Sequence, residues 1–257
     1  MPQPQVSLFL TTYNWPEALA LVLQSIAQQT ILPNEVIIAD DGSGPQTKHL
    51  IDQYREHYPI PLIHCWQKDD GYRINAVRNK AISQAKYPYI IQLDGDILLD
   101  KNFISDHLRF AKKRRLVIGR RQQISHGDTQ TFCQAKNLTP IPSFRNRLLA
   151  ILHHLILYNS TSIKGVRGCN MAYWKEDAVS INGYDADWIG KGPDDKDFAI
   201  RLVHAGIKAY NLKFYAIAHH LYHGDEGLRA NYGENQNRYS QTVKTKKTTC
   251  QNGLTQL

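Results

Sequence analysis

The first hundred residues alternate between short apolar runs and segments whose apolar residues recur at helical spacing. After the run VSLFLT at 6–11, for example, apolar side chains return at Leu19, Val22, Leu23 and Ile26. Strands alternating with helices of this length predict a mainly parallel sheet with both faces covered. The pattern predicts strands at 6–11, 36–39, 62–66 and 89–93, and helices at 46–57, at 75–85 and after Asn14, with Asn14 as N-cap and Pro16 in the first turn.

Three of the predicted strands end in polar clusters. These are TTYN at 11–14, DDGS at 40–43 and DGD at 94–96. In open parallel sheets, ligands bind outside the carboxyl ends of the strands. We therefore expect the three clusters to lie together and to form a ligand site.

The DGD cluster carries two carboxylates separated by one glycine. Like charges this close repel each other, and a hard divalent cation such as Mg²⁺ or Mn²⁺ would relieve the repulsion and bridge to a phosphate. The alternative is a solvated turn, since Asp-Gly is common in turns. The two neighbouring clusters favour the cation site.

The remaining polar residues of this half suit a nucleotide. A carboxylate of the 40–43 cluster would accept a hydrogen bond from a ring N–H, and Tyr13 would stack on a base. Arg78 would reach a pyrophosphate from the first turns of its helix. The structural alternatives are an N-cap and turn at 40–43 and a surface arginine on an amphipathic helix.

The pattern changes from about residue 101. A basic run, KKRR at 112–115, precedes a short strand at 116–119. The segment at 147–158 reads as an amphipathic helix, either core-facing or against an anionic membrane. Residues 167–206 are dense in Gly, Trp, Tyr and Asp, which suits a binding surface, and the polar stretch from 224 is predicted to be a poorly ordered tail.

Composition narrows the classes of protein. The chain has 257 residues, 42% of them hydrophobic, which is enough for one good-sized core. A net charge of +8 favours an anionic partner: nucleic acid, a phosphorylated small molecule or an acidic membrane. Four scattered cysteines predict free thiols rather than a zinc site or disulfides. With no signal-peptide pattern and no run of about 18 apolar residues, we expect a cytoplasmic protein.

The order and spacing of TTYN, DDGS, GYRINAVRN and DGD resemble family 2 glycosyltransferases of the GT-A fold, over residues 5–223. The later stretch from RGCN to VHAG resembles the galactosyltransferase-like acceptor segment of several of them. Its G-W-G-x-E-D-x-D signature reads GKGPDDKD here, so that Lys191 replaces the tryptophan and Asp194 the glutamate. The resemblance implies a Rossmann-like α/β catalytic domain of two packed halves, 1–100 for the nucleotide sugar and 101–223 for acceptor and catalysis, followed by the tail at 224–257.

The resemblance also implies a role for each candidate residue. Thr11, Tyr13 and Asp41 would bind the nucleotide, Arg78 the diphosphate and Asp94 the donor ribose or sugar. Asp96 would ligate Mn²⁺ or Mg²⁺ together with His220, or with His223 as second choice. Asp195 would be the general base beside Asp194, and Trp188, Asn170 and Lys191 would contact the acceptor, with Trp188 replacing the missing aromatic platform.

The implied reaction is inverting, metal-dependent transfer of a hexose or N-acetylhexosamine from a UDP-sugar to a hydroxyl of a glycan. The acceptor would belong to bacterial surface polysaccharide or lipooligosaccharide. A lipid-linked acceptor would place the protein at the inner face of the cytoplasmic membrane, in contact with anionic lipid.

Three alternatives stay open. A nucleotidyltransferase would need a glycine-rich basic loop after the first strand, and TTYNWPEA is not one. A nucleic-acid-binding protein would explain the charge, but acidic clusters lie where its ligand would bind, so we expect no nucleic acid. The third alternative is a homologue that binds nucleotide sugars without catalysis.

Overall fold

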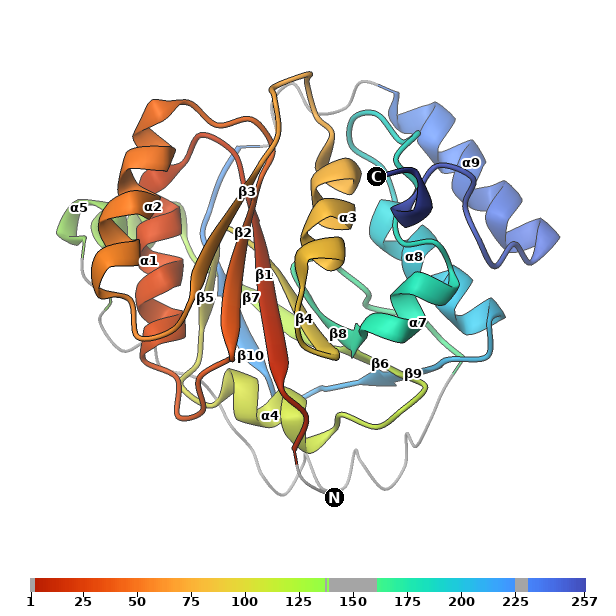
Figure 1. Ribbon diagram of the computed structural model, residues 1–257, viewed down its shortest axis with the longest axis horizontal. Coiled ribbons are helices and arrows are strands. Elements are labelled where there is room, and N and C mark those ends of the chain that lie inside the picture. Colours follow the sequence, from red (N-terminus) through yellow and green to blue (C-terminus); the bar gives the residue numbers. More distant parts are fainter. Residues whose placement is uncertain (1–2, 137, 139–160, 225–230) are drawn as a thin grey trace.

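The computed structural model describes residues 3–136, 138, 161–224 and 231–257 and has a seven-stranded sheet at its centre (Figure 1). In spatial order the strands are β3 (Leu62–Trp66), β2 (Glu35–Asp40), β1 (Val6–Thr12), β4 (Tyr89–Asp94), β8 (Asn170–Trp174), β6 (Arg115–Ile118) and β9 (Lys208–Asn211). The first four strands of this order are parallel, β8 runs antiparallel to both of its neighbours, and β6 and β9 are parallel to each other. A second sheet has the order β5 (Ile97–Leu99), β10 (Ile217–His220) and β7 (Arg120–Gln123).

Helices cover both faces of the large sheet. Successive side chains of β1 enter different cores: Leu8 lies in one apolar cluster and Phe9 in the other, as a strand buried on both faces requires. The first cluster takes in α1 (Pro16–Ala27), α2 (Pro45–His57), α4 (Phe103–Arg109) and α5 (His126–Ala135). The second takes in α3 (Ile74–Gln84), α7 (Lys175–Ser180) and α8 (Asp194–His204), on the other side of the sheet in Figure 1. The predicted mainly parallel α/β fold is confirmed.

The predicted N-cap of the first helix is wrong. Trp15 occupies that position, and Asn14 has a left-handed backbone with φ 47°. The Asn14 side chain instead accepts a hydrogen bond from the Gly44 N–H at 2.8 Å, and the backbone N–H of Asn14 donates to Ser43 Oγ at 2.9 Å. Asn14 therefore ties the turn after β1 to the turn after β2.

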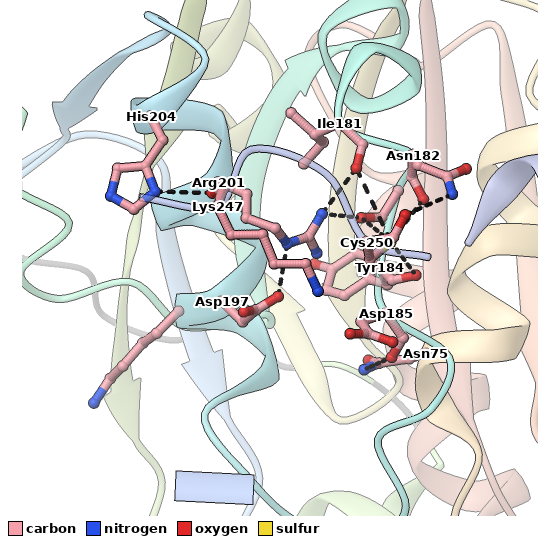
Figure 2. A network of polar contacts seen from close by, with 12 residues as sticks. Asn75, Ile181, Asn182, Tyr184, Asp185, Asp197, Arg201, His204, Lys247 and Cys250 are labelled. Atoms are coloured by element: carbon pink, nitrogen blue, oxygen red, sulfur yellow. Dashed lines mark hydrogen bonds and ion pairs between the residues drawn. The ribbon is translucent and has the colours of Figure 1, made fainter. Parts of the chain in front are cut away.

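The prediction of a poorly ordered tail is wrong for residues 231–257. This C-terminal segment forms α9 (Tyr232–Thr245) and the 3₁₀ turn η1 (Leu254–Gln256). In Figure 2, Cys250 of the segment lies beside Asn182, whose Nδ2 donates to the Cys250 carbonyl at 3.0 Å. Buried Arg201 lies nearby and donates to Asp197 at 2.7 Å and to the carbonyl of Ile181, the residue before Asn182, at 3.0 Å.

Two predictions fall on the second half of the chain. The amphipathic segment at 147–158 lies outside the described residues. Within the part of the chain that is described, no helix is both long and apolar enough to cross a bilayer. The division into halves at residues 100 and 223 remains a prediction.

Candidate active site

A cavity of about 360 Å³ opens where β1 and β4 end side by side. The parallel register of these strands pairs Thr11 with Asp94, and the Thr11 hydroxyl donates to Asp94 at 3.1 Å. The cavity thus joins the three polar strand ends, as the sequence predicts. Its lining residues are Thr11, Thr12, Tyr13, Trp15, Asp41, Gly71, Tyr72, Ile74, Asp94, Gly95, Asp96 and His223.

Gly95 allows the DGD turn to lie directly on the end of β1. A Cβ atom at this position would overlap the backbone carbonyl oxygen of Thr11. Because that obstacle is backbone, no side-chain rotation would relieve the overlap. The glycine therefore fixes the distance of both carboxylates from the first strand.

Asp41 is a nearly buried carboxylate with two fixed donors. Gln67 Nε2 donates to one oxygen at 2.6 Å, and the Arg73 N–H donates to the other at 2.9 Å. Burial raises the pKa of Asp41, and these two donors oppose the shift. Gln67 was not singled out from the sequence, although its place just after β3 was a usable signal.

Asp40 and Tyr13 complete this end of the cavity. Asp40 is fully buried and contacts His64 Nε2 at 2.8 Å. It also accepts a hydrogen bond from the Ser43 N–H at 2.8 Å, so it stabilises the turn at 40–43, which was one of the two interpretations that the sequence left open. Tyr13 is 52% exposed and donates to Asp69 at 3.0 Å. Its ring is accessible to a planar ligand, whereas Asp40 is not.

Asp96, His220 and His223 form the cluster that fits a divalent metal ion. Asp96 Oδ2 lies 3.3 Å from His220 Nε2 and 3.2 Å from His223 Nε2. One ligand atom from each residue lies within 4.8 Å of the other two. The sequence prediction chose between the two histidines, and the structure brings both to Asp96.

Two further contacts suit a metal ligand set. Asp96 Oδ1 is buried, with no hydrogen-bond partner among the described residues, and such an orphaned oxygen is what a cation would satisfy. Gln123 Nε2 lies 3.2 Å from His220 Nδ1. With its amide turned to present the oxygen, Gln123 would accept an Nδ1–H and leave Nε2 of His220 free as a ligand. Burial lowers the pKa of His220, which favours the neutral, ligating form.

Arg78 is buried beneath the site rather than in the cavity wall. Only 4% of its side chain is exposed, and it lies 3.4 Å from Asp94 Oδ1 and in close contact with Asp194 Oδ2. The guanidinium is also 5.0 Å from the centre of the Tyr184 ring. Arg78 thus joins two carboxylates, and its Nε has no hydrogen-bond partner among the described residues. It does not line the cavity, and its expected contact with a diphosphate stays a prediction.

Asp194 and Asp195 are the first two residues of α8. Arg78 links them to the DGD turn, because it contacts both Asp194 and Asp94. The Gly168 N–H donates to Asp195 Oδ2 at 3.0 Å. Burial, and next the charge of Asp194, raise the pKa of Asp195 to about 6. A carboxyl group with this pKa is a stronger base than an ordinary aspartate and is still ionised at neutral pH. Neither residue lines the cavity described above.

The three expected acceptor residues lie in different surroundings. Asn170 is buried within the sheets, where Nδ2 donates to the carbonyls of Arg120 and Ala216 and Oδ1 lies 2.9 Å from His107 Nε2. Its amide is fully used, so the structure contradicts an acceptor contact by this side chain.

Trp188 is 3% exposed, so it is not the open aromatic platform that the sequence led us to expect. Its ring packs against Gly192, where a Cβ would come within 3.1 Å of it. Lys191 is half-buried on the same loop and is the one of the three that stays near an accessible surface.

The C-terminal segment holds this loop, which the sequence gave no reason to expect. Asn235 of α9 is buried, and its Nδ2 donates to the carbonyls of Ile189 at 3.0 Å and Lys191 at 3.2 Å. The Ala186 N–H donates to the Asn252 carbonyl at 2.8 Å. The loop is therefore held from 40 or more residues further along the chain, in addition to its contacts with α3, where Asn79 bonds the Tyr184 backbone.

The chain is similar to parts of larger proteins, among them a chondroitin synthase and a hyaluronan synthase. It is 28% identical to the chondroitin synthase of Escherichia coli over 225 residues, covering 78% of this chain and 32% of that protein. It is 38% identical to the hyaluronan synthase of Pasteurella multocida over 93 residues, covering 36% of this chain and 9% of that one. The chain therefore spans a third or less of the length of these two relatives.

Solved structures of similar fold include a mannosyltransferase from Pyrobaculum calidifontis in complex with GDP-Man and Mn²⁺, with a TM-score of 0.62, 17% identity, and coverage of 90% of this chain and 60% of that one. GalNAc-T7 with UDP, GalNAc and Mn²⁺ has a TM-score of 0.68 at 14% identity, covering 93% of this chain and 48% of that chain. At these identities the likeness shows the fold, and it confirms the GT-A type.

Two family models match the sequence. The one described as the N-terminal domain of galactosyltransferase matches residues 157–224, where the acceptor-like signature lies. The one described as glycosyl transferase family 2 matches residues 7–167, which include all three strand-end clusters. The chain belongs to glycosyl transferase family 2.

Proposed function

We propose that this protein is an inverting, metal-dependent glycosyltransferase. It transfers a hexose or N-acetylhexosamine from a UDP-sugar to a hydroxyl of a glycan acceptor, in the synthesis of a bacterial surface polysaccharide or lipooligosaccharide. The observation that carries the proposal is the cluster of Asp96, His220 and His223 at the edge of a cavity that also contains Asp41 and Tyr13.

The nucleotide would occupy the cavity. Asp41 is held by two donors yet keeps free lone pairs for the N3–H of uracil. The exposed ring of Tyr13 would stack on the base, and Thr11 would stay bonded to Asp94 beneath it. Asp94 would then meet the donor ribose or sugar. These contacts orient the donor before reaction.

Asp96, His220 and His223 would hold the divalent ion, Mn²⁺ or Mg²⁺. When bound there, the ion supplies positive charge to the diphosphate leaving group. Burial disfavours charge on His220, which favours the neutral form that can bind a metal ion.

Asp195 would act as the general base. Its Oδ2 takes up the proton of the acceptor hydroxyl as that oxygen attacks the anomeric carbon from the side opposite the diphosphate, which inverts the configuration. The pKa of about 6 makes this carboxylate basic enough to assist and ionised near neutral pH. Lys191, on the loop before α8, would contact the acceptor.

A thermal-shift screen tests the proposal. UDP-galactose, UDP-glucose and their N-acetyl forms are compared with GDP-mannose, each with and without Mn²⁺. A donor at one hundred times its Kd should stabilise the fold by about 2.7 kcal/mol, only when Mn²⁺ is present. Mn²⁺-dependent hydrolysis of the best donor should follow and should vanish in Asp96→Ala. Binding without any hydrolysis or transfer would favour a catalytically inactive homologue.

We also propose peripheral contact with anionic membrane, which a lipid-linked acceptor would make useful. The basic run at 112–115 supports it, although Lys113 already contacts Glu176 at 2.6 Å and Arg114 lies 3.8 Å from Asp177. Co-sedimentation with vesicles of 30% anionic lipid should exceed that with neutral vesicles and weaken in high salt. Equal, low co-sedimentation would remove this part of the proposal.

A further inference from the structure

Arg121 of β7 lies beside the metal-type cluster, although nothing in the sequence pointed to it. β7 runs parallel to β10, with Gln123 opposite His220 and Arg121 opposite Ala218. Side chains two apart on a strand share a face, so Arg121 points the same way as Gln123. Gln123 reaches His220 at 3.2 Å, so the face that carries Arg121 is the one turned toward the cluster.

The guanidinium of Arg121 has no carboxylate partner among the described residues. Its one side-chain contact there is Cys169 Sγ, at 3.8 Å from Nη1. Burial raises the pKa of the Cys169 thiol, so this contact is neutral at ordinary pH. Of the three buried arginines in the described part of the chain, Arg78 and Arg201 each lie against a carboxylate, and Arg115 donates to the Phe110 carbonyl at 3.2 Å.

A half-buried cation without an anion is costly, which suggests that its partner is a ligand. Arg121 contacts Cys169, and the charges of Arg121, Asp94 and Asp96 all influence the pKa of that thiol. Arg121 lies on β7, next to the strand that carries His220, whereas Arg78 contacts Asp94 from α3.

We propose that Arg121 binds the β-phosphate of the nucleotide diphosphate. The proposal rests on the proposed function and changes one part of it. Arg78 is buried with its Nη atoms against Asp94 and Asp194, whereas Arg121 is only half-buried, so the cation that would meet the leaving group is Arg121.

The chemistry of the site favours phosphate over other anions. A guanidinium fork matches two phosphate oxygens, and divalent ions held by carboxylates commonly carry phosphates as their remaining ligands. An anion bound at the Asp96 cluster would thus come within the region that Arg121 faces. A carboxylate on the sugar or on the acceptor could bind Arg121 through the same oxygen chemistry, so an experiment must distinguish it from a phosphate.

Calorimetric titration of Arg121→Gln with UDP, UMP and uridine, at saturating Mn²⁺, tests the assignment. UDP affinity should fall about tenfold to a hundredfold, the value of a charge-assisted hydrogen bond, while uridine affinity stays unchanged and UMP changes little. Arg121→Lys should recover part of the loss, since it keeps the charge without the fork. Arg120→Gln is the matched control, because the exposed Arg120 is the neighbour on the opposite face of β7.

The outcomes are distinct. Equal affinity of wild type and Arg121→Gln for UDP overturns the assignment, and so does an equal loss for UDP and uridine, which would indicate general damage to the site. An unchanged UDP affinity with a raised KM for an anionic acceptor would also overturn it and indicate a carboxylate contact. If the wild-type protein binds no nucleoside diphosphate at all, the proposed function itself fails.

Discussion

Two sides of the candidate active site are held in place by different means. The strand-end side consists of the turns after β1, β2 and β4, and the ladder register aligns these turns with one another. The loop side is the segment of residues 181–193 between α7 and α8, and it is held by hydrogen bonds to the C-terminal segment, as Figure 2 shows in part, and to α3. The first side is held by a continuous ladder of strands, whereas the second is held by side-chain hydrogen bonds and by the buried ring of Tyr184.

This difference corresponds to two separate roles in the proposed function, donor binding and acceptor binding. In the proposed function the strand-end side binds the nucleotide and the metal ion, which are common to many enzymes of this kind. The loop side meets the acceptor, which differs from enzyme to enzyme. A rigid sheet edge suits the binding of the nucleotide and the metal ion, and a loop whose conformation depends on distant residues suits the binding of the acceptor.

Removing the metal ligand of the strand-end side should have the largest effect. Asp96→Ala should lower kcat about 10³-fold and abolish the dependence of activity on Mn²⁺, because two histidines alone leave the ion without its carboxylate. Asp94→Ala is the comparison, and it should mainly weaken donor affinity. Titration of Mn²⁺ against UDP-sugar hydrolysis measures both, and identical behaviour of the two variants would contradict the division of roles between the carboxylates.

The proposed base, which lies at the start of α8 just after the loop side, should come next. Asp195→Asn should lower kcat by about 10² to 10³ with UDP affinity unchanged, and the exposed neighbour Lys196→Ala should retain activity. A base must be deprotonated, and the pKa of Asp195 is raised to about 6. Wild-type kcat should therefore be constant above this pH and fall tenfold per pH unit below it, and that fall should be missing in Asp195→Asn. A pH profile that is the same in both proteins would exclude Asp195 as the base.

A substitution at Gly95 tests how firmly the sheet fixes the strand-end side. Gly95→Ala forces a Cβ onto the Thr11 carbonyl, and relieving this overlap should cost about 2 kcal/mol of unfolding free energy. Gly127→Ala is the matched control, since a Cβ there meets no atom within 4 Å. Thermal melting of both variants measures the effect. Equal melting temperatures would mean that the DGD turn can move away from β1.

The smallest effect is expected from the support of the loop side. Asn235→Ala removes two hydrogen bonds to loop carbonyls, each contributing about 1 kcal/mol, and should raise the KM for the acceptor several-fold without changing UDP affinity. Asn237→Ala, an exposed asparagine of the same helix, should change neither. A loss of UDP affinity in Asn235→Ala would show that the two sides are coupled rather than independent.

Prediction from the sequence succeeded where the pattern was local. The strands at 62–66 and 89–93 were placed within one residue of β3 and β4, because short apolar runs bounded by polar turns, in alternation with helical segments, favour buried strands. The strand-end clusters then followed from the rule that ligands bind at these ends. The errors were of another kind: Asn14 serves a neighbouring turn, and Asn170 and Trp188 are buried in contacts that no local pattern reveals.

The sequence by itself determined the α/β sheet, the meeting of three polar turns at one edge, and the family resemblance that the family match supports. Only the tertiary structure decided that both His220 and His223 reach Asp96, that Arg78 is buried against two carboxylates, and that residues 231–257 help to hold the loop before α8. The physical reason is range. Hydrophobic periodicity fixes elements through neighbours along the chain, whereas contacts such as Asp96 with His223 and Arg78 with Asp194 join residues more than 100 positions apart and depend on how whole elements pack.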